Sequence, residues 1–424
     1  MVRFLFQPMW CLLLALLLAF SSLNSKAMGL AWLLFVMTGA WVALQNQGQL
    51  RASSAHPWAK TWLFTASLAL LIKSIATFYW TDPWSERHGE LRLFLSALAL
   101  YAFVGSKDMK RITLIMLAYS LTITSAVGLL WVLFYGRNAV PTHPIPWAGS
   151  MAMVSAFLLA LSLHLDFSQL HRRLWMFGGT LSLLAVLSSQ SRGAYGITLW
   201  WLAVGLNHLW RRQTSFHASS SFRSSSSGQW ALLAAILIGL AALSQTPVFE
   251  RPVKSTQDAV NEIRISQESR EAGANSSVGS RLYMWQKSLT AIEKSPWIGH
   301  GHDARKKLLL EWAEAAQSAE VKRLGHVHNE YLHQLIDHGL WGLSSQIFYL
   351  VGLVIIAWQL LQKNHHVSAL SVAGIAFIHM TTSLTNVNFA HNYYTTSLSL
   401  FVGLSLWLTR LEPQGFGTEK SIVQ

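Results

Sequence analysis

Charged residues and cysteines are scarce in this chain of 424 residues. Asp, Glu, Lys and Arg together make up only 12% of it, whereas an ordinary soluble domain contains about 25%. Cys11 is the single cysteine, which rules out an intramolecular disulfide and a cysteine-based metal site. The sequence also lacks a glycine-rich phosphate loop, a nucleotide-binding fingerprint and an Asp-x-Asp pair, which argues against ATP or a nucleotide sugar as substrate. These shortages exclude most soluble enzyme classes.

Long apolar runs take the place of charged surface. Hydrophobic residues make up 52% of the chain and the mean hydropathy is +0.33, and a membrane-spanning helix needs about 20 apolar residues. The sequence therefore predicts an all-α polytopic membrane protein with about 12 transmembrane helices. The expected spans are roughly 8–23, 28–45, 61–80, 91–104, 112–135, 147–165, 174–190, 194–210, 230–245, 340–361, 366–384 and 392–409.

The distribution of positive charge predicts the orientation. The net charge is +13, but Lys and Arg are scattered between apolar runs rather than clustered, so we expect no nucleic acid partner. Counted over the short loops, more of these cations fall on the cytoplasmic side than on the outer side if both termini are cytoplasmic. The first span, with Arg3 and the sequence Ser25-Lys26-Ala27, is also similar to a cleavable secretory signal; the charge pattern favours an uncleaved start.

Three parts follow from this topology. Residues 1–245 would hold transmembrane helices 1 to 9. Residues 246–325 are polar and would form a helical periplasmic loop, with helical spacing at 281–294 and 304–323. Residues 326–424 would hold helices 10 to 12.

A His-Asn pair opens the third part. After His328 and Asn329 come nine residues and then Gly339 and Gly342. In a continuous helix starting near His328, the histidine and both glycines would share one stripe, and the glycines would allow close helix packing. Spacing alone leaves two alternatives for His328, an ordinary interfacial histidine or a functional one.

Other polar residues also need an interpretation. Lys73 lies inside a predicted span, and we expect it to reach the outer interface by snorkelling. The residues His300, His302, His326, His328 and Asp303 match no zinc-binding spacing, so we expect no metal. Glu330 and Asp337 could act as bases, but the pattern does not place them beside His328.

The His328-Asn329-x9-Gly339-x2-Gly342 string resembles the signature of the O-antigen ligase and polymerase superfamily of polytopic glycosyltransferases. Two more segments are similar to that family. One is Ser189-Gln190-Ser191-Arg192-Gly193-Ala194, and the other is Gly279-Ser280-Arg281-Leu282-Tyr283-Met284-Trp285 together with Pro296-Trp297-Ile298-Gly299-His300-Gly301.

The resemblance implies a GT-C-like fold in the bacterial inner membrane with a periplasmic active site. The donor would be a glycan on undecaprenyl pyrophosphate and the acceptor a sugar hydroxyl of lipid A-core. His328 would be the general base of an inverting transfer, and Arg192, Arg281 and Asn329 would bind substrate. No metal or cofactor is expected. An O-antigen polymerase and a protein O-oligosaccharyltransferase remain alternatives, and a transporter of lipid-linked glycans is one from another class.

Overall fold

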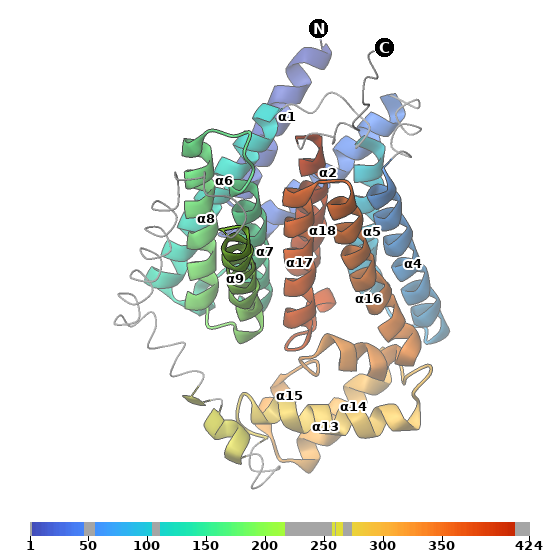
Figure 1. Ribbon diagram of the computed structural model, residues 1–424. Coiled ribbons are helices and arrows are strands. Elements are labelled where there is room, and N and C mark those ends of the chain that lie inside the picture. Colours follow the sequence, from blue (N-terminus) through green and yellow to red (C-terminus); the bar gives the residue numbers. More distant parts are fainter. Residues whose placement is uncertain are drawn as a thin grey trace, which may run out of the picture.

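The computed structural model describes residues 2–45, 56–103, 111–216, 257–258, 260–265 and 274–411. Within these ranges the secondary structure is entirely helical, without a strand, which confirms the all-α prediction. Long helices stand side by side as a bundle, and three further helices lie across one end of it (Figure 1).

The long helices coincide with the predicted spans, except that 230–245 lies outside the described residues. Five of them are long and apolar enough to cross a membrane, so the chain is a polytopic helical membrane protein, and the number twelve stays a prediction. The helices are α1 (Val2–Ala19), α2 (Ser25–Gln45), α4 (Pro57–Tyr79), α5 (His88–Phe103), α6 (Arg111–Tyr135), α7 (Pro144–Ser162), α8 (Gln169–Ser188), α9 (Gly196–Phe216), α16 (Glu330–Gln362), α17 (His366–Ser383) and α18 (Asn392–Trp407).

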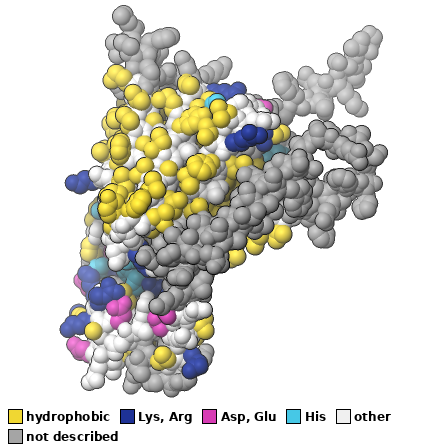
Figure 2. All heavy atoms as spheres, turned by 90° about the vertical axis from the view of Figure 1, so that its left-hand side faces the viewer, with side chains coloured by type: hydrophobic (Ala, Val, Ile, Leu, Met, Phe, Trp, Pro, Cys, Tyr) yellow, Lys and Arg dark blue, Asp and Glu magenta, His cyan; other side chains and the backbone are white. Residues whose placement is uncertain are grey.

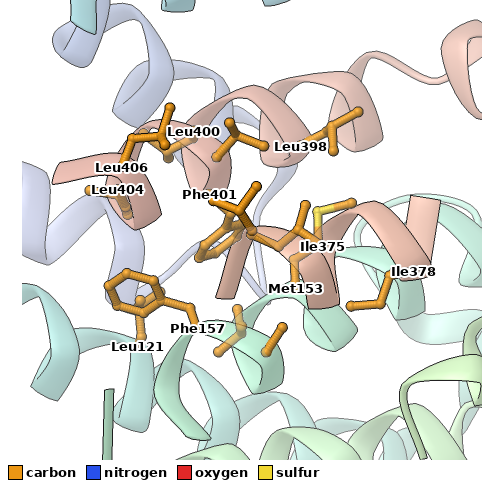
Figure 3. Close-up of a cluster of buried hydrophobic side chains, with 14 of the residues drawn as sticks. Leu121, Met153, Phe157, Ile375, Ile378, Leu398, Leu400, Phe401, Leu404 and Leu406 are labelled. Carbon is orange, nitrogen blue, oxygen red and sulfur yellow. The ribbon is translucent and has the colours of Figure 1, made fainter. Parts of the chain in front are cut away.

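Helices α7 and α18 form the centre of the bundle. Nearly all their side chains are buried, and α7 packs against α8, α17 and α18. Figure 3 shows this contact, where Phe157 of α7 faces Phe401 of α18 with ring centroids 6.5 Å apart. Apolar side chains also cover much of the outer face of the bundle (Figure 2), as expected for a surface in contact with lipid.

The three transverse helices form what we call the end layer: α13 (Gly279–Lys294), α14 (His302–Ala315) and α15 (Ala319–Arg323). They share a small core around Met284 and Trp312. The single helix predicted over 304–323 is in fact two, because Gln317 adopts a positive φ of 47° and Ser318 caps α15. The start of α1 and the end of α18 lie at the opposite end of the bundle (Figure 1).

Helix α16 differs most from the sequence-based expectation. It begins at Glu330 with Asn329 as its N-cap, so His328 lies outside it, and Gly339 interrupts it with φ 62° and ψ −151°. The predicted continuous stripe from His328 through Gly339 to Gly342 is therefore wrong.

Main-chain bonds from residues 296–301 explain this break. The His300 N–H donates to Ile336 O at 2.7 Å, and the Gly301 N–H donates to Asp337 O at 2.8 Å. The Leu340 N–H donates to Pro296 O at 2.8 Å. Backbone groups that an interrupted helix leaves unpaired are thus satisfied by a second segment, as buried backbone requires.

Candidate functional site

Four histidines meet between the bundle and the end layer, and we call them the histidine cluster. His326 and His328 lie in the loop between α15 and α16, with ring centroids 4.2 Å apart. His391, which precedes α18, lies 6.0 Å from His326 and 5.9 Å from His143, which precedes α7. His side chains are visible at this junction in Figure 2, next to Lys and Arg.

Three arginines form an adjoining arginine cluster. Arg137 is on the turn after α6, in the 3₁₀ segment Arg137–Ala139, and Arg192 follows α8 in the 3₁₀ segment Arg192–Tyr195. Arg281 lies in the first turn of α13. Burial lowers the pKa of Arg281, and the charges of Arg192 and Arg137 lower it further. The three guanidinium groups are therefore close enough to repel one another.

Arg281 joins the two clusters. Its positive charge contributes to lowering the pKa of both His326 and His328. A cation in the first turn of a helix is unfavourable because that end carries the positive pole of the helix dipole, and the buried Nε of Arg281 has no hydrogen-bond partner. Burying this charge lowers the stability of the fold, but the unpartnered guanidinium nitrogen beside two other arginines makes the site attractive to an anion.

The histidine cluster is uncharged at neutral pH. Burial lowers the pKa of His328 to about 2, and the charges of His326 and Arg281 contribute. The pKa of His326 is lowered to about 3 and that of His391 to about 4, in both cases chiefly by burial. A neutral imidazole can accept a proton, so this arrangement places a base beside an anion site.

The sequence-predicted residues lie as follows. His328 and Arg281 share one site, and Arg192 adjoins Arg281. The Asn329 Oδ1 accepts from Leu332 N–H at 3.0 Å, and its Nδ2 donates to Leu384 O at 3.2 Å. Its side chain therefore supports the start of α16, and its contact with substrate stays a prediction.

Glu330 does not face the site as a free base. Its Oε1 accepts from Gln334 Nε2 at 2.8 Å, and its Oε2 accepts from the Phe389 N–H at 2.9 Å. Both oxygens of this fully buried carboxyl group thus have partners within the protein.

Lys73 does not snorkel, contrary to expectation. Its side chain is only 1% exposed, and its Nζ donates to Gln334 Oε1 at 2.9 Å and to His338 Nδ1 at 3.2 Å. The other ring nitrogen of His338 donates to Asp82 Oδ2 at 2.7 Å. Gln334 and His338 are four residues apart on α16, so one face of that helix offers both partners to the buried ammonium group.

One group of possible metal ligands lies among the described residues. Glu86, His302 and Asp337 offer atoms within 4.8 Å of one another. However, Arg305 Nε donates to Asp337 Oδ1 at 2.6 Å, and Arg305 Nη2 lies 2.9 Å from His302 Nδ1. A guanidinium group thus holds two of the three ligands, and its charge opposes a cation there.

Gly299 provides a test of how the end layer is attached. It has φ 68°, and a Cβ there would lie 2.5 Å from the Asp337 carbonyl carbon and the His338 nitrogen. We expect Gly299→Ala to destabilise the fold by about 1 to 3 kcal/mol, through backbone strain and collision with α16. Thermal unfolding in detergent measures this. Gly205→Ala, where nothing lies within 4 Å of the new Cβ, is the matched control, and equal unfolding temperatures for both variants would contradict the prediction.

Sequence reasoning missed Arg137, His143 and His391 as site residues. Each lies just outside a predicted span. Because successive spans cross the membrane in alternating directions, these span ends are predicted to lie on the same side as His328. A search for Arg and His at span ends on that side would have found them.

Fold and site together define a polytopic helical membrane protein with a cationic, histidine-containing site at one end of its bundle. Residues 177–347 match the family model described as O-antigen ligase, and the family resemblance of the three motifs is thereby confirmed. The matched segment contains Arg192, Arg281 and His328. A protein of Haemophilus influenzae, described as uncharacterized, is 25% identical over 353 residues, which cover 80% of this chain and 83% of that protein. The family suggests a ligase activity in glycan transfer related to lipopolysaccharide.

Proposed function

We propose that this protein transfers an O-antigen glycan from undecaprenyl pyrophosphate to a sugar hydroxyl of lipid A-core, at the periplasmic face of the inner membrane. The observation that carries the proposal is the junction of a neutral His328 with the charged Arg281 and its neighbour Arg192. This combination suits a reaction with an anionic leaving group and a hydroxyl nucleophile.

The reaction follows from these groups. The His328 imidazole removes the proton from the acceptor hydroxyl, and the oxygen attacks the anomeric carbon of the donor sugar. The bond from that carbon to the pyrophosphate oxygen breaks, and its electron pair leaves with undecaprenyl pyrophosphate. Arg192 and Arg281 bind the growing negative charge through charge-assisted hydrogen bonds, and Arg137 adds a third guanidinium. Direct displacement inverts the configuration of the anomeric carbon.

Purified protein tests the proposal directly. Glycan on undecaprenyl pyrophosphate would be incubated with lipid A-core, with a peptide acceptor or with donor alone. The expected result is glycan transfer to lipid A-core, with neither transfer to the peptide nor chain extension in the incubation that contains only donor. Chain extension with donor alone would identify a polymerase, and glycosylated peptide a protein-modifying transferase. Absence of transfer to any acceptor would contradict the proposal.

Chelation tests the expectation that no metal takes part. We expect transfer to continue at its full rate in excess EDTA, because three arginines supply the positive charge that a divalent cation would otherwise give to a pyrophosphate. The initial rate with and without chelator measures this. A rate that falls on chelation and recovers when Mg²⁺ or Zn²⁺ is added would instead indicate a metal-dependent enzyme.

The orientation has its own test. A reporter active only in the periplasm should stay silent after Gln424, because the distribution of positive charge predicts that both termini are cytoplasmic. The same reporter inserted after Gln317, at the exposed turn between α14 and α15, should be active. The reverse pattern would place His328 on the side away from a periplasmic acceptor.

A further inference from the structure

His328 has a backbone conformation that its neighbours must hold. Its φ is +52°, in the left-handed region, which costs a residue with a Cβ about 1 kcal/mol or more. The residue is only 4% exposed, and the backbone angle sets the direction of the Cα–Cβ bond from which the buried imidazole extends. A strained residue persists only when the contacts around it over-determine its conformation.

Hydrogen bonds fix the loop on both sides of His328. Before it, Trp285 Nε1 on α13 donates to Val327 O at 2.8 Å. After it, Asn329 caps α16 and bonds to Leu384 O. The start of the loop has one further anchor, the bond from Arg305 to Gly325, one residue before His326.

Arg305 uses all three nitrogens of its guanidinium group. Its Nε donates to Asp337 Oδ1 at 2.6 Å, its Nη1 to Gly325 O at 3.0 Å, and its Nη2 contacts His302 Nδ1 at 2.9 Å. The Arg305 side chain is only 4% exposed and that of Asp337 is completely buried. One side chain therefore ties the His326–His328 loop, helix α16 and the start of α14 together.

A buried ion pair is a weak source of stability, because the cost of desolvating both charges offsets most of their attraction. The geometry offers another reason for this pair. The planar fork of arginine can bond a carbonyl and a carboxylate in fixed directions at once, whereas lysine offers a single ammonium point. The guanidinium group of Arg305 therefore fixes the distance between Gly325 and Asp337. His328 lies in the segment of chain between these two residues.

We infer that Arg305 is a positioning residue, which aims the His328 imidazole at the acceptor hydroxyl by fixing the loop against α16. This inference rests on the proposed role of His328 as the base. Arg305 itself touches neither substrate. Its loss should lower turnover and leave donor binding intact, because the arginine cluster is built from other elements.

Four purified proteins test the inference: wild type, Arg305→Lys, His328→Ala and the double variant. Lysine keeps the charge beside Asp337 and loses the bond to Gly325, so the protein should fold. We expect Arg305→Lys to reduce kcat about ten- to hundredfold, since a base misplaced by about 1 Å can cost that much, with a donor Kd within about twofold of wild type. The double variant should be no slower than His328→Ala. Lys306→Gln, which removes an exposed cation from the adjacent position, is the matched control and should turn over like wild type.

The outcomes separate the two hypotheses. Wild-type turnover in His328→Ala would overturn the proposed base role of His328, and with it the positioning role of Arg305, while leaving the transfer activity itself intact. A slow His328→Ala with a normal Arg305→Lys would overturn only the positioning role. Independent, multiplicative losses in the double variant, or a donor Kd that rises in parallel with the loss of turnover in Arg305→Lys, would also overturn it.

Discussion

Replacing His328 by alanine should reduce glycan transfer by about 10² to 10⁴, the usual contribution of a positioned general base. Membrane abundance and donor binding should stay close to wild type, because His328 Nδ1 has no hydrogen-bond partner whose loss would weaken the fold. Turnover and donor affinity, measured on the same purified protein, test this. The control is His366→Ala. His366 is exposed, lies at the first residue of α17 and is not part of the histidine cluster.

The pH dependence provides a second check on the same residue. Without donor, the pKa of His328 is about 2, so the base is already neutral across the physiological range. A bound pyrophosphate brings negative charge beside Arg281, which favours the protonated imidazole and raises that pKa. The acid limb of kcat should therefore lie at higher pH than that of kcat/KM for the donor. Coincident limbs, or near wild-type turnover of His328→Ala, would contradict the general-base role.

Replacing Arg281 by alanine should reduce transfer by about 10² to 10³ and weaken donor binding at the same time. The reason is that Arg281 carries an unpartnered guanidinium nitrogen and adjoins both clusters. Arg281→Lys retains the charge without the fork, and should recover part of the lost binding. Donor affinity and initial rate are the two measurements.

A matched control separates this effect from a general loss of positive charge. Lys287 is exposed and lies on the same helix as Arg281, so Lys287→Ala removes the same charge outside the site and should leave both quantities unchanged. Full activity of Arg281→Ala would remove that residue from the site. Arg192→Ala should behave like Arg281→Ala, since the two charges act on one another.

The sequence predicted the helices of the bundle well because apolar length alone determines them. It also singled out His328, Arg192 and Arg281 as candidate site residues, since these lie within local motifs, and their roles stay predictions. Local sequence patterns carry no information about hydrogen-bond partners from other parts of the chain. The break at Gly339 depends on backbone bonds from residues 296–301, which no periodicity within α16 can reveal.

The same limit applies to the remaining polar residues. Arg137 and His143 lie in the connection between α6 and α7, whereas His391 precedes α18, so these residues meet only through the packing of α7 against α18. The burial of Lys73 depends on Gln334 and His338, which lie on a helix far away in the sequence. The residues around Lys73 do not reveal these partners, and they therefore favoured a lysine that reaches the membrane interface. Contacts across the bundle decided these cases, and they were not accessible from spacing alone.

The bond between Lys73 and Gln334 joins residues 261 positions apart in the chain, and this sets an order of events during synthesis. At about 5 to 20 residues per second, α4 waits on the order of ten to fifty seconds before α16 exists. Until then its lysine has neither Gln334 nor His338 as a partner, and a bare ammonium within hydrocarbon is costly. We therefore expect the lysine of the nascent α4 to stay near the bilayer surface until α16 (Glu330–Gln362) has been made.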